Sequence, residues 1–271
     1  MSKILRYSIG NPIKTEAVVQ KIPKEKGELP YFKYVQKMEV TKQTKDGKEQ
    51  DSLVYKLNCE DKIYGLGENV RGINKRGWIY KSNCTDDPNH TETKSSLYGA
   101  HNFFVIDGKE TFGVFLDYPG KLILDMGYQR MDELCITPEE WNLDLYILEG
   151  DSVLDIVKTF RQIIGRSYIP PKWAFGFGQS RWGYQNEEDI RTVVRGYREN
   201  GIPLDSVYLD IDYMEQFKDF TVDEKHFPNF PEFVEEMKQE HIHLVPIIDA
   251  GVKIEEGYEV YEEGIQNGFF C

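Results

Sequence analysis

Polar and acidic side chains follow three apolar segments in the second half of the chain. The cluster Ser180-Arg181-Trp182-Gly183-Tyr184 comes directly after one segment, and Asp210 and Asp249 come directly after the other two. A carboxylate accepts charge-assisted hydrogen bonds from hydroxyl groups, and an indole ring offers a flat apolar face with one N–H donor. These groups together suit a ligand that carries hydroxyl groups around an apolar face, as a sugar ring does.

Each of these residues also has an ordinary structural role. One of Asp210 and Asp212 can face a cavity while the other packs sideways or caps the next loop, and for either residue alone a capping role is about as common. Core packing is the usual fate of a tryptophan. The position of Trp182 just after a strand is what favours a functional role.

Repeated strand and helix patterns position these residues. Strands are predicted at 174–179, 206–209 and 244–248, the last one buried, and a second helix begins near Pro231. The first helix has Asn186 as its N-cap, acidic residues in its first turn, and apolar residues at Ile190, Val193, Val194 and Tyr197. Strand, helix and strand in this spacing indicate right-handed βαβ units, whose strands end at one common edge.

The region from residue 53 to residue 148 instead contains short strands separated by turns. Segments 102–106 and 112–116 predict a hairpin with a primed turn at Asp107-Gly108, and 143–148 alternates in polarity. This pattern is typical of an antiparallel sandwich. The long polar segment 82–96 interrupts it, and we expect this loop to be functional or disordered, with disorder favoured.

Composition excludes several classes of protein. The 271 residues carry a formal net charge of −13, which argues against nucleic acid or an anionic membrane as partner. No apolar segment is long enough to span a bilayer and the N-terminus lacks a signal-peptide core, so we expect a cytoplasmic protein.

Neither a metal site nor a cofactor site is predicted. The four cysteines, at 59, 84, 135 and 271, form no C-x-x-C pair. His241 and His243 have no third ligand near them in sequence, which favours a structural role. Gly176-Phe177-Gly178 lacks the third glycine and the following helix of a dinucleotide site.

Several ordered motifs from Tyr64 onward resemble glycoside hydrolase family 31, which includes α-glucosidases and α-xylosidases. The motifs are Tyr64-Gly65-Leu66-Gly67-Glu68, Leu97-Tyr98-Gly99-Ala100-His101, Pro170-Pro171-Lys172-Trp173, Ser180-Arg181-Trp182-Gly183-Tyr184, Leu209-Asp210-Ile211-Asp212-Tyr213-Met214 and Asp219-Phe220-Thr221. The resemblance implies a β-sandwich domain (1–150), a connecting helix and linker (151–171), and the first βα units of a (β/α)8 barrel (172–271).

The resemblance also implies a set of substrate-binding residues for an α-linked oligosaccharide. Asp210 matches the aspartate that binds the non-reducing sugar, with Ile211 beside it. Trp182 and Asp249 match residues that line the same pocket. Asp86, adjacent to Asp87, is the nearest match to an aspartate that a sandwich loop offers to the leaving-group side.

The family hydrolyses its substrates with retention, through two carboxylates about 5 Å apart that belong to later barrel strands. No Trp-x-Asp-Met-Asn-Glu-like segment occurs up to Cys271, so we assign no catalytic residue. We expect the front part of a retaining α-glucosidase, truncated and inactive by itself. The alternatives are a non-catalytic carbohydrate-binding or assembly piece and an α-xylosidase, and the sequence allows a homo-oligomer.

Overall fold

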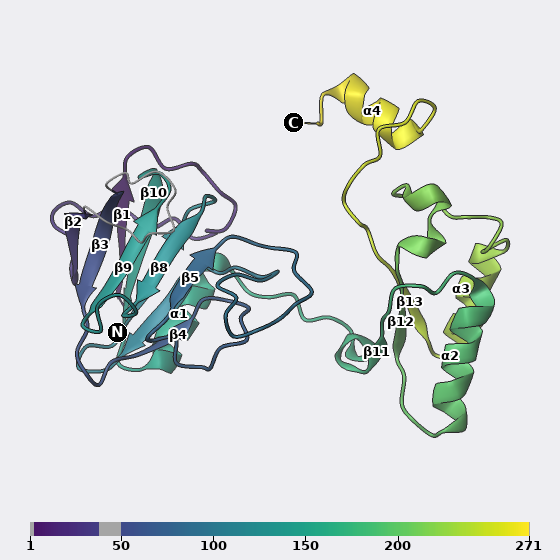
Figure 1. Ribbon diagram of the computed structural model, residues 1–271, viewed down its shortest axis with the longest axis horizontal. Coiled ribbons are helices and arrows are strands. Elements are labelled where there is room, and N and C mark those ends of the chain that lie inside the picture. The colour runs from purple at the N-terminus through teal and green to yellow at the C-terminus, as the bar shows by residue number, and fades with distance from the viewer. Residues whose placement is uncertain (1–2, 38–49, 271) are drawn as a thin grey trace. The chain divides into compact units, whose positions relative to one another are not determined.

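The computed structural model describes residues 3–37 and 50–270 (Figure 1). The chain divides into two compact units, Met1–Ser167 and Tyr168–Cys271. Within the described residues, no helix is both long enough and apolar enough to cross a membrane.

The first unit is a sandwich of two antiparallel sheets, which confirms the predicted fold. In the described residues each sheet has five strands, in the orders β1-β10-β7-β6-β4 and β2-β3-β9-β8-β5. The first sheet contains β1 (Lys3–Ile9), β10 (Leu143–Glu149), β7 (Phe112–Asp117), β6 (Phe103–Asp107) and β4 (Lys62–Gly65). The second contains β2 (Phe32–Lys37), β3 (Gln50–Lys56), β9 (Glu133–Pro138), β8 (Leu122–Met126) and β5 (Ile79–Ser82).

Aromatic and aliphatic side chains from both sheets fill the space between them. Phe112 is fully buried at the centre of an aromatic group. Its ring stacks on Tyr31 with centroids 4.2 Å apart and meets the edges of Tyr55 and Phe32 at 5.3 and 6.2 Å. This packed interior gives the sandwich a hydrophobic core of its own.

Helix α1 (Val153–Ile164) covers the outer face of the first sheet. Ser152 caps it by accepting a hydrogen bond from the main-chain N–H of Asp155. Phe160 stacks on Phe103 of β6 with centroids 3.8 Å apart. Because a helix lies on this face, the alternating strand β10 is buried on both sides, including Tyr146.

The predicted primed turn between β6 and β7 is wrong. Ile106 pairs with Phe112, so residues 107–111 form a longer connection. Gly108 does not adopt the left-handed conformation that a primed turn requires. A Cβ atom at Gly108 would lie 2.1 Å from Oδ1 of Asp61, so close approach to that buried carboxylate explains the glycine.

The second unit begins a TIM-barrel domain, with the parallel sheet β11-β12-β13 (Figure 1). Its elements are β11 (Gly178–Gln179), α2 (Glu187–Glu199), β12 (Ser206–Leu209), α3 (Phe230–Gln239), β13 (His243–Pro246) and α4 (Glu259–Asn267), with short 3₁₀ helices η1 (Lys172–Phe175), η2 (Ile211–Tyr213) and η3 (Glu215–Phe217). Helices α2 and α3 pack on the sheet through one core that includes Val207, Leu209 and Phe233. Both βαβ patterns predicted from the sequence are therefore present.

Two predictions about these strands need correction. The strand predicted at 174–179 is mostly absent, because the main-chain N–H groups of Ala174 and Gly176 bond to the carbonyls of Pro171 and Trp173 and form η1 instead. The strand near 244–248 is not buried, since β13 lies at the sheet edge and only one of its faces meets a helix.

Candidate functional site

The loops that follow the three parallel strands form one candidate site. After β12 the chain turns at once into η2, and Asp210 is the N-cap of this short helix. Oδ1 of Asp210 accepts a hydrogen bond of 2.7 Å from the main-chain N–H of Ile211. This bond fixes the orientation of the carboxylate at the strand end.

Side chains tie the three strand-end loops to one another. Gly183, in the loop after β11, donates its main-chain N–H to Oδ2 of Asp212 at 3.1 Å. The hydroxyl of Tyr213 donates to the carbonyl of Ile247, after β13, at 2.9 Å. The structure therefore joins the loops that carry Trp182, Asp210 and Asp249, and it gives Asp212 a structural task.

These residues differ in how far they reach into solvent. Trp182 is 70% exposed and Asp249 is also exposed, whereas Asp210 and Ile211 are half-buried. An exposed indole ring and an oriented carboxylate, on loops that a hydrogen bond joins, suit the apolar face and the hydroxyl groups of a sugar ring. Asp86 belongs to the first unit.

A strained segment follows η2. Gln216, Phe217 and Phe220 all adopt left-handed backbone angles, with φ of 51°, 62° and 62°. Between them Asp219 is only 2% exposed, and its Oδ1 has no hydrogen-bond partner in the structure. Burial and the nearby charge of Asp219 raise the pKa of Tyr213. The motif Asp219-Phe220-Thr221 marks this segment in the sequence, but the sequence does not indicate that the carboxylate of Asp219 is buried.

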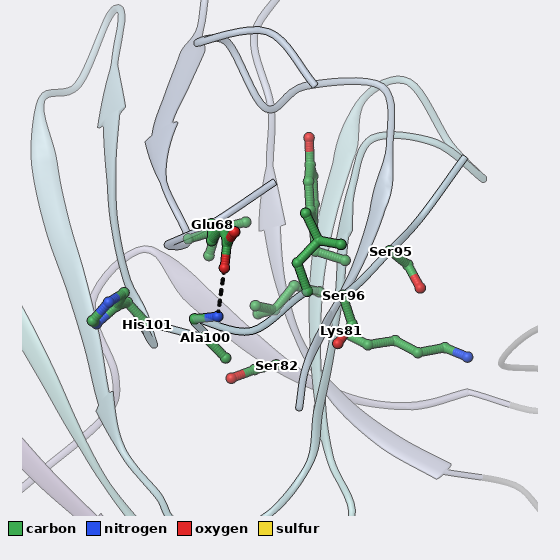
Figure 2. A pocket seen from close by; sticks show the side chains of 12 residues that line it. Glu68, Lys81, Ser82, Ser95, Ser96, Ala100 and His101 are labelled. Carbon is green, nitrogen blue, oxygen red and sulfur yellow. Dashed lines mark hydrogen bonds between the residues drawn. The ribbon is translucent and has the colours of Figure 1, made fainter. Parts of the chain in front are cut away.

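In the first unit, two of the sequence motifs bind each other. The main-chain N–H of Glu68 donates to the carbonyl of Gly99 at 2.8 Å. The N–H of Gly99 donates to Oε2 of Glu68 at 2.9 Å, the bond that is dashed in Figure 2. Gly67 has a left-handed φ of 72°, and a Cβ there would lie 2.6 Å from the carbonyl oxygen of Gly99. The glycines of these motifs therefore allow the two segments to approach closely.

Segment 83–96 leads into the motif that contains Gly99, and it has no helix or strand of its own. It is nevertheless held in place: Lys81 bonds to the carbonyl of Ser95 at 2.9 Å, and Thr85 to that of Leu97 at 2.8 Å, both through their main-chain N–H groups. An ion pair with Lys94 lowers the pKa of Asp87. The prediction of disorder is wrong, because these contacts connect the two arms of the loop.

Asp86 and Asp87 have different surroundings in this loop. The carboxylate of Asp87 is occupied by Lys94, whereas Asp86 is exposed. A hydrogen bond to Asp86 raises the pKa of the Tyr98 hydroxyl. The ring of Tyr98 also meets the edge of His90, with centroids 5.7 Å apart. Asp86 is therefore the exposed aspartate of the pair, with Tyr98 rather than a lysine as its hydrogen-bond partner.

The parts of the chain that the structure describes contain no evident metal-binding site. In residues 3–37 and 50–270, no cluster of three or more His, Cys, Asp or Glu side chains could hold a metal ion. His243 instead stacks on Trp173, with ring centroids 4.0 Å apart.

Two family models match separate parts of the chain. The Glycosyl hydrolases family 31 TIM-barrel domain matches residues 167–271, and the Glycosyl hydrolase 31 N-terminal galactose mutarotase-like domain matches residues 12–125. The order of these two matches agrees with the sandwich and the parallel sheet described above. The chain belongs to glycoside hydrolase family 31.

Named relatives support this assignment. Alpha-glucosidase 2 of Bacillus thermoamyloliquefaciens is 36% identical over 214 residues, which cover 78% of this chain and 27% of that protein. The alpha-glucosidase of Saccharolobus solfataricus is 28% identical over 79% of this chain and 31% of that protein. The chain thus spans less than a third of the length of these two relatives.

Solved structures share the fold. A Flavobacterium johnsoniae GH31 dextranase in complex with glucose superposes with a TM-score of 0.74 at 24% identity. The match covers 81% of this chain and 27% of the dextranase chain.

Proposed function

We propose that this chain is the N-terminal part of a retaining α-glucosidase, which removes terminal α-linked glucose from oligosaccharides. The strand-end site is the observation that supports this proposal most strongly. A hydrogen bond from Ile211 orients Asp210, and the bond from Gly183 to Asp212 joins this loop to the one that carries Trp182. The names of the two similar alpha-glucosidases favour glucose over xylose as the sugar released. A cytoplasmic location and a homo-oligomeric state stay predictions.

Each residue has a proposed role at the non-reducing end of the substrate. Asp210 accepts hydrogen bonds from hydroxyl groups of the terminal glucose, with the bond from Ile211 holding its carboxylate in place. Trp182 packs its indole face against the sugar ring, and Ile211 and Asp249 line the same pocket. Asp86 contacts the sugar on the leaving-group side.

The chemical step needs two further carboxylates. Retention requires a nucleophile and a general acid/base whose carboxyl groups lie about 5 Å apart. We propose that both lie outside residues 1–271, so that Asp210 and Asp249 bind the sugar and form no covalent bond with it. The 271 residues by themselves are then inactive, and all activity tests below use the enzyme with its complete barrel.

The first test replaces Asp210 with alanine and measures hydrolysis of an aryl α-glucoside. Loss of a carboxylate that binds substrate hydroxyls should lower kcat/KM on the order of 10³-fold or more. Glu224→Ala, at an exposed carboxylate of the same unit, serves as control and should change it little. Unaltered turnover by Asp210→Ala would refute the assignment.

The second test concerns the pocket wall. Trp182→Tyr shortens the exposed aromatic surface, so the preference among α-glucosidic linkages should change. Competition between maltose and isomaltose measures this preference. An unchanged ratio would count against Trp182 as part of the pocket.

A further inference from the structure

We propose that Arg71 is a positioning residue: it holds segment 83–96 in the arrangement that presents Asp86 to the leaving-group side of the substrate. The inference rests on the proposed function, because it assumes that Asp86 meets the leaving-group sugar. It adds a residue that no sequence motif indicated.

Arg71 connects the two arms of the loop. Its side chain is buried, and Nη1 donates to the carbonyl of Ile79 at 2.7 Å, at the start of the strand that leads into the loop. Nε donates to the carbonyl of Glu92 at 2.8 Å, and Nη2 to that of Thr93 at 3.5 Å, both in the returning arm. One guanidinium therefore fixes the spacing between the arms on either side of Asp86.

Aromatic rings fix the plane of this guanidinium. Its central carbon lies 4.2 Å from the ring centroid of Trp78 and 4.9 Å from that of Tyr80. A planar group stacked on rings can send its N–H donors in fixed directions, which a lysine ammonium cannot do. The loop position thus depends on the shape of arginine as well as on its charge.

The partners of Arg71 are main-chain groups of the loop arms and not an acidic side chain. Within the described residues its three hydrogen bonds of defined geometry end on main-chain carbonyls, and it forms no ion pair. Lys75, buried nearby, bonds to Oδ1 of Asn69 at 2.7 Å and to the carbonyl of Gly72 at 2.9 Å. Neutral oxygen atoms therefore hold both cations.

Arg76 provides a matched control. It also donates to main-chain carbonyls, those of Asn58, Cys59 and Asp61 at 2.6, 3.2 and 3.0 Å in the loop before β4 and that of Met131 at 2.8 Å between β8 and β9. Arg76→Lys and Arg71→Lys therefore make the same chemical change, and only the second affects segment 83–96.

The experiment compares two substrates in the active enzyme, together with amide hydrogen exchange of segment 83–96. Maltose has a sugar as leaving group, and an aryl α-glucoside does not. Arg71→Lys should raise KM for maltose and lower its kcat/KM roughly 10- to 100-fold, because a misplaced contact group loses binding. The kcat/KM for the aryl substrate should change less than about threefold, and amide exchange in segment 83–96 should become faster. Arg76→Lys should change neither the substrate ratio nor the exchange rate.

Trp78→Leu removes a ring beside the guanidinium at a partly exposed position, and it should give the same shift to a smaller extent. This second variant keeps the test open if Arg71→Lys does not fold. Equal losses on both substrates, or faster exchange with an unchanged substrate ratio, would overturn the positioning role.

Asp86→Ala separates the inference from its premise. It should change the maltose to aryl ratio as Arg71→Lys does, and the double variant should add little. A changed ratio in Asp86→Ala without one in Arg71→Lys overturns the positioning role alone. An unchanged ratio in Asp86→Ala refutes the assignment of Asp86, and the positioning role is then refuted with it.

Discussion

The first sheet of the sandwich and the parallel sheet of the second unit contain similar apolar sequences but are buried very differently. Every residue of β7 (Phe112–Asp117) is buried, since the second sheet covers one face and α1 covers the other. In β13 no residue is fully buried. The comparison teaches that apolar content alone does not determine burial; a second packed layer is also needed.

The uncovered face of the parallel sheet has a specific meaning in this family. Val207 and Leu209 face the helices and are buried, whereas Tyr208 between them is 37% exposed. Parallel sheets are normally covered on both faces. As the second unit begins a TIM-barrel domain, we expect the Tyr208 face to become the barrel interior in the active enzyme.

Truncating a side chain to alanine should give the largest difference in lost stability between the two regions. Phe112→Ala should destabilise the sandwich by about 3–5 kcal/mol, because it empties the centre of the aromatic group. Tyr208→Ala in the 271-residue chain should cost less than about 1 kcal/mol, since 37% of Tyr208 is already exposed to water. Urea dependence of amide exchange, read separately for each unit, measures both changes; equal costs would contradict the comparison.

Helix caps should have a smaller and similar effect in both regions. Ser152 caps α1 and Asn186 caps α2, each through a hydrogen bond to the main-chain N–H three residues later. Alanine at either position should cost about 1 kcal/mol, because capping is local and does not depend on how the sheet is covered. A much larger loss for Asn186→Ala would mean that the second unit is only marginally folded. The same exchange measurement decides this.

Acid should change the stability of the two regions in opposite directions, and this is the smallest of the expected effects. Arg191 lowers the pKa of Glu236 and bridges α3 to α2, so this stabilisation is present above the ordinary pKa of 4.5 and is lost as pH falls through the lowered value. Burial raises the pKa of Asp117 in β7, so protonating it as pH falls should instead favour the folded sandwich. Because Glu236 is partly exposed, its effect should stay below about 1 kcal/mol.

Matched variants isolate these two contributions. Glu236→Gln should flatten the acid loss of the second unit, and Asp117→Asn should remove the acid gain of the sandwich. Unit-resolved unfolding between pH 3 and pH 6 measures both. An acid response that neither variant alters would show that other carboxylates dominate.

Local patterns in the sequence were enough to predict much of the fold. Helix α2 follows from its cap at Asn186 and its apolar periodicity, and β12 follows from a short apolar run before Asp210. The primed turn predicted after β6 is wrong because Gly108 is required by its close approach to Asp61, a residue far away in sequence. Contacts of that kind leave no local signal.

The candidate site divides in the same way. Its position at the strand ends could be predicted, because parallel strands bring their C-terminal ends to one edge. The bond from Gly183 to Asp212 and the hold of Arg71 on Glu92 could not, since each joins segments more than twenty residues apart. The order of segment 83–96 could not be predicted either, because the bonds from Lys81 to Ser95 and from Thr85 to Leu97 join two arms that have no periodic pattern.

The most direct test of the central claim is the anomeric configuration of the glucose first released from an aryl α-glucoside, followed by proton NMR before mutarotation. A retaining α-glucosidase built on these residues should release α-glucose first. Release of β-glucose first would contradict the retaining mechanism. No release by the enzyme with its complete barrel would contradict the glycosidase itself and favour a non-catalytic carbohydrate-binding role.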